Sequence, residues 1–276
     1  MTLGRRKKRM SFSRHAITAT MLLAALPAAV PVQAASSDWY ETEGGRIRLV
    51  TTGAPSPEGT LRAALQVDVA PGWKTYWRDP GDAGVPPQVT FPADSGVRDV
   101  SIGFPVPKRF DEGSAAWTGY EWPVSLALTL HLSPGETPRA LEADVFLGLC
   151  ETICIPVQTK LTLDPARKAD DIFDRSVVNA AFDSLPAKAS PAFGVTSARR
   201  QGDTLAVETT AKNTETLDLF LAGSGGYQFG EPVRAPDNKS FTARILTEPK
   251  SATAPTTILY TLSAGETAVQ GQFTLP

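Results

Sequence analysis

Residues 144–157 read Asp-Val-Phe-Leu-Gly-Leu-Cys-Glu-Thr-Ile-Cys-Ile-Pro-Val, and this stretch decides much of what the chain can be. Up to Cys150 the apolar residues alternate with period two, as in a half-buried strand. The predicted inward face carries Val145, Leu147 and Leu149. After Cys154 a second alternating run opens at Val157. We therefore expect both cysteines at a strand-to-strand turn, at the end of a sheet.

The same alternation recurs in other parts of the first half of the chain. It is clear over residues 61–69, 125–132 and 157–163. Turn residues separate these runs, at Pro71-Gly72, Asp79-Pro80-Gly81, Pro86-Pro87 and Ser133-Pro134-Gly135. Several short strands joined by Gly and Pro turns are typical of an antiparallel β-sandwich, so the predicted fold class is all-β.

One segment breaks the period-two pattern. From Ala169 to Leu185 apolar residues recur at helical spacing, acidic residues precede them, and Pro186 follows. This predicts a short helix, with residues 186–191 as a linker.

Alternation then resumes in the last third of the chain, in runs around residues 205–207, 217–221, 241–245, 258–262 and 269–275. We expect residues 35–166 to form the first sandwich, residues 167–191 the helix and linker, and residues 192–276 a second, smaller β-sandwich. The last region contains no Cys, His or Trp, so we expect it to serve as a spacer or docking module.

The N-terminus has the pattern of a secretory signal peptide. Six basic residues precede an apolar stretch, and Val32-Gln33-Ala34 is a small-x-small cleavage signal. We predict a signal peptide over residues 1–34, cleaved near Ala34, and export to the periplasm, where disulfides persist. An uncleaved N-terminal anchor is the alternative. No later run is long and apolar enough to span a membrane.

Charge and composition exclude several classes of partner and ligand. Without residues 1–34 the chain keeps 21 basic and 29 acidic residues, a formal charge of −8, which argues against nucleic acid and anionic membranes. That part of the chain has no Met and a single His, His131, on the polar face of a predicted strand. His-rich metal sites and thioether copper sites are therefore not expected, and we predict no cofactor.

Cys150 and Cys154 are the only cysteines, and three interpretations of the pair remain open. The first is a redox couple that exchanges disulfides with a partner. The second is a passive brace, since closing so short a loop stabilises a fold by only about 2 kcal/mol. Two thiolates could also bind Cu(I). The Cys-x3-Cys spacing resembles copper-delivery proteins of cytochrome oxidase assembly, but these need a third ligand, usually His.

Aromatic residues gather in the fifty residues before this turn. They are Trp73, Tyr76, Trp77, Phe104, Phe110, Trp117, Tyr120 and Trp122. They suit either a sandwich core or a shield around the cysteines. Asp111 and Glu112 follow Phe110 and could raise the pKa of a nearby thiol, unless they lie on a solvated turn.

In three places the sequence resembles the N-terminal periplasmic domain of the DsbD disulfide reductase family, including its ScsB-like branch. Residues 71–78, Pro-Gly-Trp-Lys-Thr-Tyr-Trp-Arg, resemble its Gly-aromatic-x-x-Tyr strand. Residues 107–112, Pro-Lys-Arg-Phe-Asp-Glu, lie where the family has an acidic stretch around a cap-loop phenylalanine. Residues 148–156 resemble its Gly-x-Cys…Cys-x-Pro active-site turn. The resemblance covers roughly residues 38–165.

The resemblance implies an immunoglobulin-like sandwich that passes electrons from a membrane-embedded disulfide reductase to thioredoxin-like periplasmic proteins. These partners isomerise disulfides or serve cytochrome c biogenesis. If the family's residue roles are transferred to this sequence, Cys154 is the attacking thiol and Cys150 the resolving one, as in a protein-disulfide reductase. Phe110 is the cap over the pair and Tyr76 a supporting aromatic. The family's membrane part and thioredoxin domain are not in this sequence, so a separate membrane protein would supply electrons, and the direction of flow stays open. The alternatives are a non-catalytic binding or assembly module and a Cu(I)-handling protein.

Overall fold

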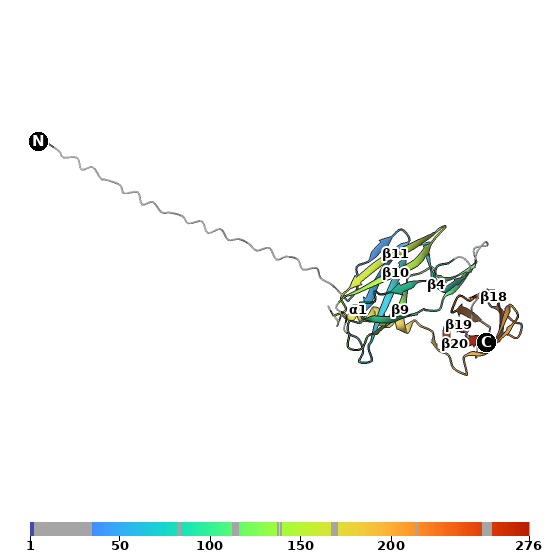
Figure 1. Cartoon of the computed structure of the whole chain (residues 1–276). Coiled ribbons are helices and arrows are strands. Elements are labelled where there is room, and N and C mark those ends of the chain that lie inside the picture. The colour runs from blue at the N-terminus through green and yellow to red at the C-terminus, as the bar shows by residue number, and fades with distance from the viewer. Residues whose placement is uncertain are drawn as a thin grey trace. The chain divides into compact units, whose positions relative to one another are not determined.

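The computed structural model describes residues 1–2, 35–81, 84–111, 116–136, 138, 140–166, 171–212, 215–249 and 256–275. The predicted signal peptide with its cleavage site, Glu112 and the side chain of Asp111 lie outside the described residues. Within them the fold is almost entirely β, with one helix, which confirms the predicted class (Figure 1).

Two antiparallel sheets form the first sandwich. The first sheet has the strand order β1-β2-β3-β9-β6. Its strands are β1 (Tyr40–Thr42), β2 (Gly45–Thr51), β3 (Thr60–Val69), β9 (Val124–Leu132) and β6 (Val97–Gly103). The second has the order β11-β10-β4-β8-β7, and β5 also pairs with β10. These are β11 (Cys154–Leu163), β10 (Leu141–Cys150), β4 (Lys74–Gly81), β8 (Ala116–Tyr120), β7 (Lys108–Asp111) and β5 (Gln88–Thr90).

The period-two alternation creates the core between these sheets. Alternate apolar residues of β3, β9 and β10 are fully buried in one cluster, among them Leu61, Leu65, Leu126, Leu128, Leu141 and Leu147. Each such side chain contributes about 1.5–3 kcal/mol when it leaves water. The intervening residues of β10 and β11 point to the outer face of the second sheet, so this face is available for other side chains.

Helix α1 (Ile172–Asp183) covers the outer face of the first sheet. Its N-cap is Asp171, whose carboxylate accepts backbone hydrogen bonds from Phe173 at 2.9 Å and Asp174 at 3.3 Å. Val178 and Ala181 pack against Val50, Ala64 and Ala127 of that sheet. The helix is thus where the sequence predicted it, but it begins after Ala169.

A second sandwich follows the helix, built from the sheets β12-β20-β19-β15 and β13-β14-β18-β16, with β17 beside β18. Its strands are β12 (Ala187–Lys188), β13 (Gly194–Gln201), β14 (Thr204–Thr210), β15 (Leu217–Gly223), β16 (Gln228–Phe229), β17 (Val233–Arg234), β18 (Ser240–Thr247), β19 (Thr256–Ala264) and β20 (Thr267–Leu275). It has its own buried cluster, which includes Leu205, Leu219, Phe241 and Leu262. The segment expected as a linker contains β12, which pairs in parallel with β20, so it is part of this sandwich rather than a free connection.

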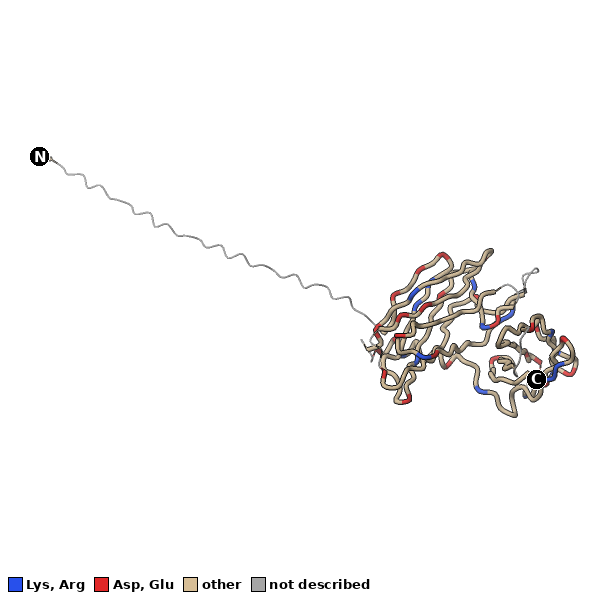
Figure 2. Tube along the Cα trace, viewed as in Figure 1, with Lys and Arg blue, Asp and Glu red and all other residues tan. Residues whose placement is uncertain are grey.

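Residues 33–276 form one unit by their contacts, and the two sandwiches share a buried contact. Phe220 and Ala222 of β15 belong to the same apolar cluster as Trp77 of β4. Figure 2 shows acidic and basic positions interspersed along both sandwiches. In the described part of the chain, no helix is both long enough and apolar enough to cross a membrane.

Candidate functional site

Cys150 is the last residue of β10 and Cys154 the first of β11, and they form a disulfide. The two strands pair along their full length, from Leu141 opposite Leu163 to Cys150 opposite Cys154. Glu151 N donates a 3.2 Å hydrogen bond to Ile153 O across the turn. This long ladder fixes the base of the turn, as the sequence predicted, and holds the disulfide at the end of the sheet.

The two cysteines differ in exposure. Cys150 is only 2% exposed, whereas Cys154 is exposed to solvent. Ile153, between them, is 70% exposed. One half of the disulfide is therefore accessible to another molecule and the other half is shielded by this protein.

The hydroxyl of Tyr76 is hydrogen-bonded to both sulfurs. Its hydroxyl lies 2.9 Å from Cys150 Sγ and 3.0 Å from Cys154 Sγ. Because sulfurs in a disulfide carry no hydrogen, the tyrosine O–H is the donor. Strand β4 brings it there by pairing Lys74 with Cys150 and Thr75 with Leu149, so that Tyr76 lies on the outer face with the cysteines.

Gly148 makes room for this tyrosine. A Cβ atom at position 148 would lie 3.0 Å from Cε2 of the Tyr76 ring, closer than ordinary van der Waals contact. The glycine of the Gly-Leu-Cys sequence thus leaves room for the ring beside β10, from where its hydroxyl reaches both sulfurs.

Phe110 and Trp117 extend the aromatic surroundings of the disulfide. They are cross-strand partners on β7 and β8, and their rings stack with centroids 3.9 Å apart and planes 9° apart. Trp117 also meets Tyr76 edge to face, with centroids 6.0 Å apart. Cys150, Tyr76 and Trp117 form a buried cluster, and half-buried Phe110 packs against it. The structure therefore brings all four predicted site residues, Cys150, Cys154, Phe110 and Tyr76, to one place.

Two residues at this site were not predicted as site residues: Trp117, which was expected only as one of the aromatic residues, and Lys74. Lys74 is only 8% exposed although it is charged, and it is the cross-strand partner of Cys150. Its Nζ lies 4.6 Å from the centroid of the Trp117 ring, a cation–π distance. A positive charge is thus buried on the face of the sheet that carries the shielded cysteine. The sequence did contain a sign of this: Lys74 lies two positions before Tyr76, so on a strand the two side chains share one face.

The remaining aromatic residues belong to the sandwich core. Trp73, Trp77, Phe104 and Tyr120 are buried in the main cluster, and Trp122 packs against it. These five aromatic residues thus belong to the core, whereas Tyr76, Trp117 and Phe110 pack around Cys150, and a shielding role for those three stays a prediction.

His131 and the two cysteines lie in different sheets of the first sandwich. It is on β9 of the first sheet, opposite Thr60 on one side and Asp99 on the other. The part of the chain that the structure describes contains no group of three His, Cys, Asp or Glu residues that could hold a metal ion.

Comparison with known proteins gives one family and one fold. Residues 49–166 match the family described as "Thiol:disulfide interchange protein DsbD, N-terminal". The crystal structure of the N-terminal periplasmic domain of ScsB from Proteus mirabilis is similar, with a TM-score of 0.70 and 23% identity, over 87% of this chain and 98% of that one. At this identity the likeness shows the fold, and its coverage extends well beyond residues 49–166. No curated protein matches the chain.

Proposed function

We propose that this protein exchanges disulfides with periplasmic thiol proteins through Cys150 and Cys154, because residues 49–166 match the family of DsbD N-terminal domains. The family and the paired cysteines support thiol:disulfide exchange in general. The observation that carries the finer proposal is the unequal exposure of the two cysteines.

The unequal exposure gives the two sulfurs different roles. A partner thiolate attacks Sγ of exposed Cys154, a mixed disulfide forms, and the bond between the two cysteines breaks. The electron pair of that bond leaves on Cys150 as a thiolate. A second thiolate of the partner then attacks the partner's sulfur in the mixed disulfide, which releases Cys154 and completes the reduction. If Cys150 attacks Cys154 instead, the original disulfide forms again. Read in reverse, Cys154 of the reduced protein attacks a partner disulfide and Cys150 resolves it.

Neighbouring side chains support these steps. The Tyr76 hydroxyl donates to both sulfurs and is positioned to stabilise a thiolate on either one. Phe110 packs against the cluster around Cys150, as a residue that caps the pair between encounters would. The exposed Ile153 offers a partner an apolar contact next to the reacting sulfur.

We propose the following electron path. A separate membrane-embedded disulfide reductase reduces the disulfide, and the dithiol then reduces thioredoxin-like periplasmic proteins, including those that serve cytochrome c biogenesis. This makes the protein a thiol:disulfide oxidoreductase of the protein-disulfide reductase type, with residues 35–166 as the redox domain. Support comes from the DsbD family and from the periplasmic location that the description of the ScsB domain states for that protein.

A trapping experiment tests the assignment of the cysteines. The probe is a thioredoxin-fold protein that keeps its attacking cysteine, lacks the resolving one, and carries thionitrobenzoate on the remaining sulfur. Reduced protein with Cys150→Ser should form a stable mixed disulfide with this probe, visible on a non-reducing gel, because its only thiol is exposed. The matched variant Cys154→Ser keeps only the shielded thiol and should react far more slowly. Equal trapping by both variants would contradict the proposed order of attack.

The reduction potential separates exchange from a passive brace. Structural disulfides of exported proteins have potentials below about −300 mV, whereas exchange-active pairs lie above that value. We expect a potential above this limit when the disulfide is equilibrated with glutathione buffers. A lower value would show that the disulfide only braces the turn.

A further inference from the structure

The strand that carries Phe110 is held by the second sandwich. Strand β7 is the last strand in the order of its sheet and pairs with β8. Along such a strand, successive side chains point to opposite faces. Phe110 faces Trp117 and the cysteine cluster, and the preceding residue, Arg109, points the other way, toward β15.

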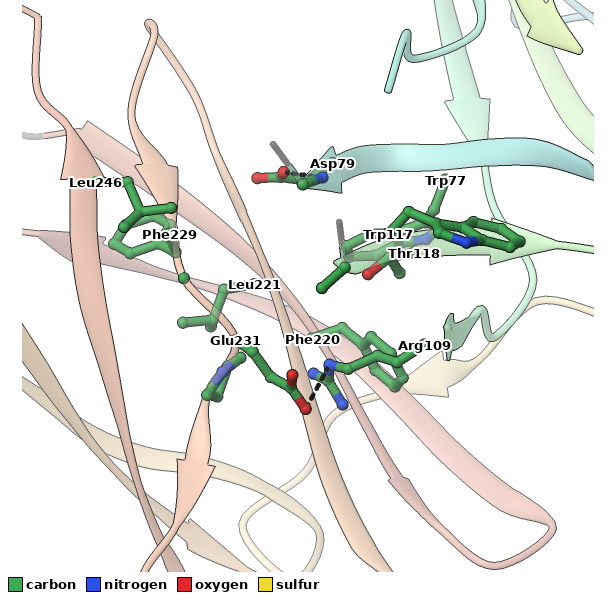
Figure 3. A pocket seen from close by; sticks show the side chains of 14 residues that line it. Trp77, Asp79, Arg109, Trp117, Thr118, Phe220, Leu221, Phe229, Glu231 and Leu246 are labelled. Atoms are coloured by element: carbon green, nitrogen blue, oxygen red, sulfur yellow. Dashed lines mark hydrogen bonds and ion pairs between the residues drawn. The ribbon is translucent and has the colours of Figure 1, made fainter. Parts of the chain in front are cut away.

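Arg109 makes a dense set of contacts with consecutive residues of β15. One guanidinium nitrogen donates to both carboxylate oxygens of Asp218, and another donates to the backbone oxygen of Leu219. The guanidinium carbon lies 4.1 Å from the centroid of the Phe220 ring. Glu231 adds a second carboxylate at 3.6 Å (Figure 3). Arginine is suited to this combination because its planar group can pair with a carboxylate and stack on a ring at once.

The surroundings of Arg109 indicate a packed contact rather than a ligand site. Its side chain is only 18% exposed. Trp77 of the first sandwich meets Phe220 edge to face, with centroids 5.9 Å apart, beside the arginine. The pocket that these residues line has a volume of about 80 Å³, well below the roughly 300 Å³ at which small-molecule sites begin.

From these contacts we propose that Arg109 is a positioning residue, through which the second sandwich holds Phe110 against the disulfide site. The inference rests on the proposed function in one respect, that Phe110 controls access to the disulfide. The inference gives the second sandwich a definite role. It fixes β7, an edge strand that otherwise pairs only with β8. A loosened β7 should let Phe110 leave Trp117 more often, and thiols should then reach the disulfide faster.

The test measures the rate at which dithiothreitol reduces the disulfide of the full chain. The variant Arg109→Met removes the guanidinium and keeps most of the apolar stem. We expect it to be reduced about threefold to tenfold faster, which corresponds to a loss of about 0.6–1.4 kcal/mol of the interaction that holds β7. Asp218→Asn changes the other partner, on the second sandwich, and should act in the same direction. Hydrogen exchange of the β7 amides should also become faster in both variants.

A double variant separates positioning from general loosening of the fold. If Arg109 acts through Phe110, then Arg109→Met should add nothing to the rate in a Phe110→Ala background. Additive rates would overturn the proposal, as would an unchanged rate in both Arg109→Met and Asp218→Asn. Arg46→Met is the control, because it removes an exposed arginine that pairs with Asp68 within the first sheet, and it should leave the rate unchanged.

The outcome does not depend on the trapping experiment, because dithiothreitol needs no protein partner. If Phe110→Ala alone leaves the rate unchanged, the cap role assigned to Phe110 fails, and with it this inference. Disulfide exchange through Cys150 and Cys154 would still stand.

Discussion

Replacement of Tyr76 by Phe tests how the site controls the energy of its sulfurs. The change removes one oxygen and keeps the ring, which packs against Gly148 and meets Trp117 edge to face. The lost atom is the donor that lies 2.9 Å from Cys150 Sγ and 3.0 Å from Cys154 Sγ. The variant therefore separates the hydrogen bond from the packing of the ring.

The size of the effect follows from the charge on sulfur. In the disulfide both sulfurs are neutral and weak acceptors, so the hydroxyl gains little. In the proposed exchange the electron pair leaves on Cys150 as a thiolate, and a hydrogen bond to a charged group is roughly twice as strong as a neutral one. Typical net values leave a difference of about 1 kcal/mol in favour of the reduced form. For a two-electron couple this corresponds to about 20 mV, so Tyr76→Phe should make the potential about 20 mV more negative.

The potential can be measured by equilibrating the protein with glutathione buffers and alkylating the free thiols for mass spectrometry. Tyr120→Phe is the control, because it removes a buried hydroxyl that donates a 2.8 Å hydrogen bond to Pro105 O in the core. That variant should lose about 1 kcal/mol of unfolding free energy and keep the wild-type potential. A Tyr76→Phe potential equal to or above that of the wild type would refute the reasoning.

Three further perturbations address the packing, the charge and the pH response of the fold. Gly148→Ala should lower the free energy of unfolding by about 1–3 kcal/mol in urea titrations, because its methyl group would press on the Tyr76 ring; a neutral change would mean that the ring moves freely. In a Cys154→Ser background, Lys74→Met should raise the pKa of the Cys150 thiol, read from thiolate absorbance, because the buried cation on its cross-strand partner is lost; an unchanged pKa would show that the ammonium does not act on the sulfur. Hydrogen bonds from Arg200 and Tyr227 hold the pKa of Glu248 at about 2, below its ordinary 4.5, so this carboxylate stabilises the fold above pH 4.5 and loses that effect as the pH falls toward 2. The stability difference between wild type and Glu248→Gln should shrink over this interval, and a difference that stays constant would contradict it.

The hairpin that carries the cysteines could be predicted because its information is local. Strands β10 and β11 are adjacent in sequence, and each alternates apolar and other residues over its length. A turn between two such runs leaves one antiparallel pairing, which places Cys150 opposite Cys154. The helix was predicted for the same reason, since both its apolar period and its capping residue, Asp171, lie within one segment.

The long-range parts of the site could not be predicted from these patterns. The alternation puts Lys74 and Tyr76 on one face, but it does not say that β4 lies beside β10, whose Cys150 is 74 residues further along the chain. The contact between Arg109 and Asp218 spans 109 residues, and nothing near either residue indicates the other. Likewise β12 is two residues long and pairs through its backbone with β20, so no side-chain pattern marks it as a strand.

The position of the disulfide on the outer face of a sheet has a consequence for the direction of electron flow. The core on the inner face stabilises the sandwich through residues such as Leu147 and Leu149, which take no part in the chemistry. The outer face is therefore free to bury one sulfur under Tyr76 and Trp117 while Cys154 stays accessible. Under the proposed order of attack, a reducing partner and an oxidising partner both meet the exposed Cys154 first. The direction of flow would then follow from the difference in potential between the partners. We propose that Tyr76, which hydrogen-bonds to both sulfurs, and Lys74, the cross-strand partner of Cys150, adjust the potential of this disulfide.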